Sequence, residues 1–158
     1  MARILEQLSL EGVTEAHLFV LRRFEEDREL CEKLQPDFYA SPAGWIAEIA
    51  QARRMGWLGR LQHTYVGFVD LAVEDGEGLA YLSIYVTPEY RQMGVGSAMV
   101  RMLAPGLGEL GVQALLAETE ADNWPARRCL RRAGFRPLGS EEEPVLEYAL
   151  GLSPLGSC

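Results

Sequence analysis

The amino-acid sequence predicts an α/β (α+β) fold, in which helices cover both faces of a mixed, mostly antiparallel sheet of six to seven strands. Three observations predict it. Residues 57–86 contain three successive strand patterns, which is typical of an antiparallel meander. Residues 86–104 join a strand to a helix through a loop with two glycines. Residues 113–119 form a short apolar run, which is typical of a strand buried on both faces.

The N-terminal part predicts one strand and two helices. Residues 3–8 are rich in apolar and β-branched side chains, so we expect a strand there. Residues 14–34 place apolar side chains near helical spacing between charged ones, which predicts a helix. A second helix is expected over residues 45–55, after the prolines and glycine of residues 36–44.

The rest of the chain continues with strands and helices in alternation. The meander consists of strands at 58–62, 65–73 and 79–86, with a hairpin turn at 74–78. After it we expect a helix at 94–104, a strand at 113–119, a helix at 124–133 that ends at Gly134, and closing strands at 135–138 and 145–150. Pro105 lies where the first of these helices would continue. Because an internal proline removes a hydrogen bond and clashes with the preceding turn, we predict a kink or break there.

Composition narrows the class of protein. The chain of 158 residues is 48% hydrophobic and 24% charged, which is typical of one globular domain. We assign residues 1–150 to that domain and 151–158 to a flexible tail. The formal charge of −8 argues against a nucleic-acid-binding surface, which needs clustered Lys and Arg. No apolar run is long enough for a signal peptide or a membrane span, so we expect a cytoplasmic protein that does not bind membranes.

The cysteines and histidines do not indicate a metal site. Cys31, Cys129 and Cys158 are widely spaced, with no C-x-x-C pair, and His17 and His63 are the only histidines. Neither a disulfide framework nor a zinc site is therefore expected.

The strongest local signal is the strand–loop–helix junction of residues 86–98. The first amides of a helix have no partner within it, and the helix dipole adds positive potential, so such a junction binds anions. Gly94 and Gly96 let a diphosphate approach the backbone closely. We therefore expect Gly96→Glu to abolish binding of the phosphate ligand while leaving the fold intact.

Two other phosphate-binding motifs fit less well. The dinucleotide fingerprint requires a third glycine where Met99 stands, and a later acidic residue that is missing from the region of residues 114–117. The P-loop requires Gly-Lys-Ser/Thr, which does not occur in the sequence. A dinucleotide-binding domain is consequently the weakest of the functions considered.

The sequence resembles the GNAT superfamily of N-acetyltransferases. Its signature Arg/Gln-x-x-Gly-x-Gly/Ala is matched by Arg91, Gly94 and Gly96. Its second element, Asn-x-x-Ala-x-x-x-Tyr-x-x-x-Gly-Phe, is matched at Asn123, Ala126, Gly134 and Phe135, with Leu130 in place of the tyrosine. The resemblance is specific over residues 79–135.

The resemblance implies a coenzyme A site and a splay between the fourth and fifth strands. The pantetheine arm of acetyl-CoA would pair with the main chain of residues 84–86, and the diphosphate would rest on the amides of residues 92–97. The residues expected to contact the cofactor are Ile84, Tyr85, Val86, Arg91, Gln92, Met93, Gly94, Val95, Gly96, Ser97, Asn123, Ala126 and Leu130. No metal is required.

The chemistry implied is direct transfer of acetyl to a primary amine. Leu130 cannot protonate the departing thiolate as the usual tyrosine does, although a thiolate is itself a good leaving group. Tyr85 is an alternative acid, and Glu118 or Glu120 is a candidate base. A domain that binds acyl-CoA without turnover, as a sensor, remains the alternative function.

Several assignments stay open from sequence alone. The acceptor is an amine of a small molecule or of a protein, and a homodimer is common among relatives. The aromatic residues of the N-terminal half belong either to the core or to the acceptor pocket; these are Tyr39, Trp45, Trp57 and Tyr65. The arginines after Asn123 form either a solvated face or a contact with the coenzyme's phosphates; these are Arg127, Arg128, Arg131 and Arg132. Cys129 is expected in the core.

Overall fold

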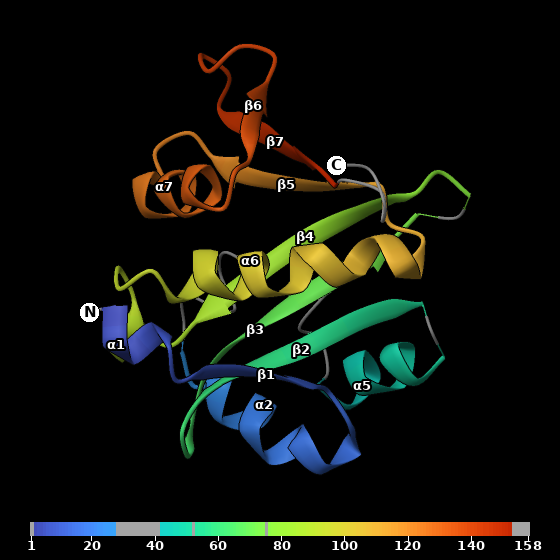
Figure 1. Ribbon diagram of the computed structural model, residues 1–158, viewed down its shortest axis with the longest axis vertical. Helices are drawn as coiled ribbons and strands as arrows, with labels where there is room; N and C mark the ends of the chain where they lie inside the picture. Colours follow the sequence, from blue (N-terminus) through green and yellow to red (C-terminus); the bar gives the residue numbers. More distant parts are fainter. Residues whose placement is uncertain (1, 28–41, 52, 75, 153–158) are drawn as a thin grey trace.

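A seven-stranded sheet forms the centre of the molecule (Figure 1). The computed structural model describes residues 2–27, 42–51, 53–74 and 76–152. The strand order is β1-β2-β3-β4-β5-β7-β6, and every neighbouring pair is antiparallel except β4 and β5. The strands are β1 (Leu8–Gly12), β2 (Arg54–Leu61), β3 (Thr64–Val73), β4 (Leu79–Val86), β5 (Ala114–Glu120), β6 (Arg136–Leu138) and β7 (Val145–Gly151). The predicted mixed sheet is confirmed.

Helices lie on both faces of this sheet. α2 (Leu18–Phe24) and α5 (Pro42–Ala50) cover one face, over a core that includes Phe68 and Tyr85. α6 (Val95–Leu107) and α7 (Trp124–Arg132) cover the other, over a larger core around Met99 and Leu115. Short helices also occur; these are α1 (Ala2–Leu5), η1 (Glu15–His17), η2 (Pro88–Tyr90) and η3 (Gly108–Leu110). No helix in the described part of the chain is long and apolar enough to cross a membrane.

The start of the chain differs from the prediction. Residues 3–8 were expected to form a strand, but α1 occupies Ala2–Leu5 and the strand begins at Leu8. The segment is too short to show a period, and Ala, Arg and Leu are good helix formers. The predicted helix over residues 14–34 is present only in part, as η1 and α2, because α2 ends at Phe24. The predicted range from residue 28 onward lies outside the described residues, as do Cys31, Tyr39 and Cys158.

The predicted break at Pro105 is also wrong, because α6 runs through it to Leu107. Pro105 lies in the last turn of the helix, and the loss of its N–H leaves one acceptor, the Arg101 carbonyl, without its helical partner. Arg101 and Pro105 are both exposed. Water can therefore hydrate that carbonyl, and the helix continues for two more residues.

The pairing of β4 with β5 stops early, and this positions the site. Only Leu79, Ala80 and Tyr81 pair with β5, opposite Ala114–Leu116. β4 continues to Val86 beside β3, while all of β5 pairs with β7. The two strands therefore diverge after Tyr81, as the predicted splay requires.

A buried carboxylate ties α5 to the sheet. Asp70 on β3 is 1% exposed and accepts hydrogen bonds from the Trp45 indole at 2.7 Å and from Arg54 at 2.8 Å. Trp45 also packs against Phe68, so this aromatic residue belongs to the core. Burial raises the pKa of Asp70 to about 7, an effect that the Trp45 hydrogen bond and the Arg54 charge only partly oppose.

This pKa predicts how stability depends on pH. In the unfolded chain an aspartate has a pKa near 3.9. Between about pH 4 and pH 7 the folded protein therefore binds more protons at Asp70 than the unfolded chain does, and this contribution to stability falls as pH rises. Asp70→Asn keeps the acceptor for Trp45 and removes the titration. Urea unfolding at pH 5 and pH 7.5 should show the wild type losing about 1 kcal/mol or more relative to the variant. A parallel pH dependence of the two proteins would contradict this assignment, and the exposed substitution Glu109→Gln serves as control.

Candidate active site

A cleft with a volume of about 730 Å³ lies between the diverging ends of β4 and β5 and is walled by α6 and α7. It brings together most of the residues predicted from the sequence. Those that line it are Ile84, Tyr85, Val86, Arg91, Gln92, Gly94, Val95, Gly96, Ser97, Glu118, Glu120, Asn123, Ala126 and Leu130. Met93 is the exception, because its partly buried side chain packs against the core.

The start of α6 presents backbone amides to this cleft. Gly94 is the N-cap, with a φ of 84° that favours glycine, and it has no side chain to accept from the first amides of the helix. The hydroxyl of Ser97 donates to the Gly94 carbonyl at 3.2 Å. Gln92, just before, also has a positive φ of 61°. The amides of Val95–Ser97 have no intrahelical partner, so this end is suited to an anion.

Gly96 is needed for packing as well as for access. It is buried, and a Cβ on it would lie 2.9 Å from the Cys129 sulfur and 3.4 Å from Ile84 Cγ2. A side chain at this position requires the Cys129 sulfur to move, so Gly96→Glu is expected to weaken the packing of α6 against α7 in addition to blocking an anion. Cys129 itself lines the cleft and is only partly buried in the core. Burial raises the pKa of its thiol to about 11, so the thiolate is scarce at neutral pH.

The Arg91 side chain points from the loop toward α2. Its guanidinium forms an ion pair with Asp27, which follows the C-terminal end of α2, and its Nε donates to the Val86 carbonyl at 2.9 Å. It also lies 5.8 Å from the Tyr85 ring centroid. The loop at the start of α6 is thereby linked to the opposite face of the sheet.

Tyr85 contacts the same carboxylate, that of Asp27. Its side chain is 5% exposed and its hydroxyl donates to Asp27 at 2.9 Å. Burial and that hydrogen bond both raise the pKa of the phenol above its ordinary value. A phenol that already donates to a carboxylate and that has a raised pKa is a poor proton donor, which argues against Tyr85 as the general acid.

The arginines of α7 have different environments. Arg127 is 7% exposed, donates to the Tyr148 hydroxyl, the Ala121 carbonyl and Glu141, and lies 4.0 Å from the Trp124 ring. It anchors α7, so its assignment to a solvated or phosphate-binding face is wrong. Arg131 pairs with Glu141, whereas Arg128 and Arg132 are exposed and line the cleft.

Asn123 caps α7. Its side-chain oxygen accepts from the Ala126 amide at 3.3 Å, and this leaves the side-chain N–H groups available to a ligand in the cleft. Leu130, seven residues on, is 5% exposed in the core beneath the cleft.

Glu118 and Glu120 face the side of the sheet that α2 covers. Side chains alternate along a strand, and Leu115 and Ala117 are buried in the core on the α6 side. Both glutamates therefore project to the other side and are exposed. By the same alternation Ser83 shares this side with Tyr85, because Leu82 belongs to the α6-side core.

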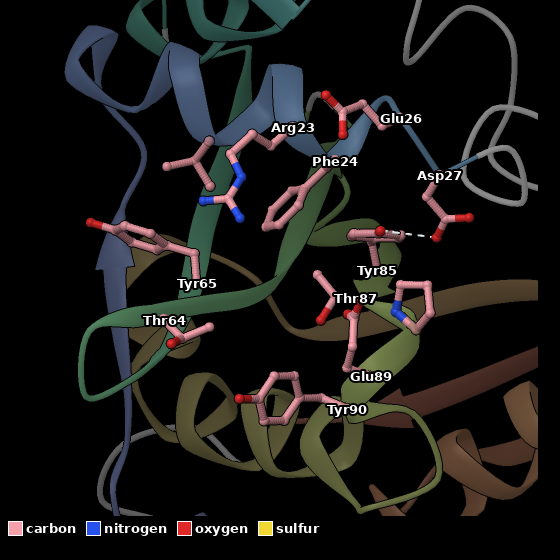
Figure 2. A pocket seen from close by; sticks show the side chains of 12 residues that line it. Arg23, Phe24, Glu26, Asp27, Thr64, Tyr65, Tyr85, Thr87, Glu89 and Tyr90 are labelled. Atoms are coloured by element: carbon pink, nitrogen blue, oxygen red, sulfur yellow. Dashed lines mark hydrogen bonds between the residues drawn. The ribbon is translucent and has the colours of Figure 1, made fainter.

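A second hollow of about 610 Å³ opens on the α2 side (Figure 2). Tyr85, Pro88 and Tyr90 line both hollows. Tyr65, which the sequence left open between core and pocket, lines this one, whereas Trp57 packs against the core.

Sequence reasoning missed residues that join the site through the fold. Ser83 and Thr119 line the cleft because they lie on the diverging strands, and the strand pattern alone carried no signal for their role. Arg128 was predicted on the exposed side of a helix. Its orientation toward the cleft depends on how α7 packs, which the sequence does not show. Asp27 contacts Arg91, which lies 64 positions later in the sequence, and no local motif reveals such a contact.

Comparison with known proteins shows which family and which solved structures this chain is similar to. Residues 18–135 match the model of the acetyltransferase (GNAT) family. No curated protein matches the chain in sequence. Among solved structures, an acetyltransferase from Salmonella typhimurium that modifies the N-terminal serine of a 50S ribosomal subunit protein has a TM-score of 0.78 and 19% identity, over 93% of this chain and 96% of that one.

Two further structures share the fold. Spermidine N-acetyltransferase from Vibrio cholerae, in complex with CoA and spermine, has a TM-score of 0.76 and 14% identity, over 93% of this chain and 96% of that one. Aminoglycoside acetyltransferase AAC(6')-Ib, in complex with coenzyme A and kanamycin, has a TM-score of 0.71 and 19% identity, over 91% and 94%.

The contact between Gly96 and Cys129 can be tested with a double-mutant cycle. Gly96→Ala adds a Cβ that the Cys129 sulfur blocks, and such overpacking costs about 1–3 kcal/mol. Cys129→Ala removes the sulfur. The double variant should therefore be more stable than the sum of the single effects predicts, by about 1 kcal/mol in urea unfolding. Additive single effects, to within about 0.5 kcal/mol, would show that the two residues are not in contact.

Proposed function

Since the chain belongs to the GNAT family of acetyltransferases, we propose that its cleft binds acetyl-CoA and that the acetyl group passes directly to a primary amine. The observation that carries this proposal is the early end of the β4–β5 pairing. From Leu82 to Val86, the edge of β4 that faces β5 has no strand partner. Such an edge can pair with an extended chain that carries amides, as the pantetheine arm does.

The residues present fit the coenzyme. The uncapped amides of Val95–Ser97 would hold the diphosphate, and the absence of a Cβ at Gly96 keeps the backbone accessible. Arg128 and Arg132 line the same cleft and supply positive charge for phosphate groups. The side-chain N–H groups of Asn123 would donate to the arm. The Val86 carbonyl already accepts from Arg91, and its second lone pair stays available.

Acetyl-CoA, when bound, supplies the acetyl group as a thioester whose thiolate leaves readily. With Leu130 at the position of the usual tyrosine and the Tyr85 hydroxyl committed to Asp27, the cleft offers neither group as a general acid. A thiol has a pKa near 8.5, so its thiolate can depart without protonation by the protein. The chain's catalytic contribution would therefore concern the amine and not the thiol.

The acceptor amine must lose a proton before it attacks. An alkyl ammonium has a pKa near 10.4 and is almost fully protonated at neutral pH. Glu118 is exposed, lines the cleft and projects to the α2 side, where an amine can approach from the face opposite α6 and α7. We assign it as the base, acting directly or through one water, with Glu120 as the nearby second carboxylate.

Thiol release from acetyl-CoA with a panel of primary amines tests this function, and Glu118→Gln tests the base. We expect the wild type to release thiol only when an amine is present. The variant should have a kcat lower by about 10²–10⁴ at neutral pH, with the difference shrinking toward the pKa of the amine, where the substrate arrives neutral. Glu147→Gln is the matched control, because Glu147 lies opposite Glu118 on β7 and outside the cleft lining.

Three outcomes would contradict parts of this account. Binding of acetyl-CoA without thiol release by any amine would support a non-catalytic acyl-CoA sensor. A raised KM with unchanged kcat in the Glu118 variant would indicate that the carboxylate attracts a cationic substrate by charge. Equal kcat and KM would leave Glu118 without a role in the reaction.

A further inference from the structure

The hollow on the α2 side adjoins the cleft and is large enough for a small ligand. It has a volume of about 610 Å³ and shares Tyr85, Pro88 and Tyr90 with the cleft. Tyr85 forms part of the wall between them, with its hydroxyl directed at Asp27 (Figure 2). A molecule whose one end reaches the diverging strands from the α2 side would have its other end in this hollow.

Negative charge predominates around the hollow. Glu26, Asp27 and Glu89 line it, and among the described lining residues Arg23 carries the only positive charge. Asp27 is paired with Arg91. Glu26 and Glu89 are both exposed and have no ion pair within the described part of the chain. Figure 2 shows the Arg23 guanidinium between the rings of Tyr65 and Phe24, with Phe24 between it and Asp27.

The remaining walls suit an alkylammonium group. The rings of Phe24, Tyr65 and Tyr90 line the hollow, and aromatic faces attract cations. The hydroxyl oxygen of Thr87 is buried and has no hydrogen-bond partner in the described structure. Its side chain lies between those of Tyr85 and Tyr90 (Figure 2), but the oxygen itself is covered, so an alkylammonium group would contact the aromatic rings and the carboxylates and not this hydroxyl.

Carboxylates thus flank Tyr85 on two sides. Glu118 and Glu120 belong to the cleft and project to the α2 side, and Glu26 and Glu89 belong to the hollow. We propose that the hollow holds the far end of the acceptor and selects amines that carry a second positive charge, such as diamines. This inference rests on the proposed function, because it assigns the reacting amine to the cleft beside Glu118.

Three ligands of matched length test the charge preference. Their dissociation constants for the protein saturated with CoA can be measured by titration calorimetry with butylamine, 1,4-diaminobutane and 4-aminobutanoate. We expect the diamine to bind about five- to tenfold more tightly than butylamine, since each exposed carboxylate contributes modestly. Glu26→Gln/Glu89→Gln should reduce this preference to about twofold or less, with butylamine unaffected. Glu109→Gln on η3 is the control and should change neither constant.

Three results would overturn the proposal. The first is equal binding of butylamine and the diamine by the wild type, and the second is a diamine preference that survives in the double variant. The third is tightest binding of 4-aminobutanoate, which would assign Arg23 as a carboxylate site. The binding measurement does not depend on turnover, so it decides this inference even if no thiol is released. Conversely, if butylamine supports thiol release and the diamine binds no more tightly than butylamine, the transferase function is supported and the proposed charge preference is wrong.

Discussion

The divergence of β4 and β5 is the constraint on which the rest of the site depends. β5 pairs with β7 along its whole length and β4 pairs with β3 up to Val86, yet β4 and β5 pair with each other only up to Tyr81, so each strand continues with one edge unpaired. Buried backbone N–H and C=O groups require partners, and an unpaired strand edge is therefore stable only where water or a ligand can reach it. The cleft meets that requirement, and the first residues of α6 also line it, so that the free amides of this helix lie at the same opening.

The two faces of the sheet present different chemical groups to the diverging strands. On the α6 side, Gly96 and Cys129 bring α6 and α7 into contact, and the arginines of α7 contribute positive charge to the cleft. On the α2 side, carboxylates and aromatic rings surround the second hollow. Arg91 joins the two, since it belongs to the loop before α6 but pairs with Asp27 after α2. The anionic ligand and the cationic ligand that we propose would thus approach the diverging strands from opposite faces, each toward complementary charge.

Sequence predicted the elements whose pattern is local. β4 was predicted at its observed bounds because alternation, the turn before it and Pro88 after it all agree. The short N-terminal segment failed because four residues show no period. Pro105 was misjudged because the cost of a proline depends on solvent access to the carbonyl it leaves free, which a sequence does not show. Arg127 looked solvated because its partners Tyr148 and Glu141 lie far along the chain. The same holds for Asp27 and Arg91, so the link between the two faces required the fold.

Hydrogen–deuterium exchange with and without acetyl-CoA tests the central claim most directly. If the diverging edge of β4 pairs with the coenzyme, peptides covering residues 82–86 and 92–97 should exchange more slowly when acetyl-CoA is bound. Peptides from β2 should be unchanged, because β2 lies on the far side of β3. Protection of residues 92–97 alone would support the phosphate site and contradict the strand-like pairing of the coenzyme with β4. Binding of acetyl-CoA without protection of either segment would contradict the account.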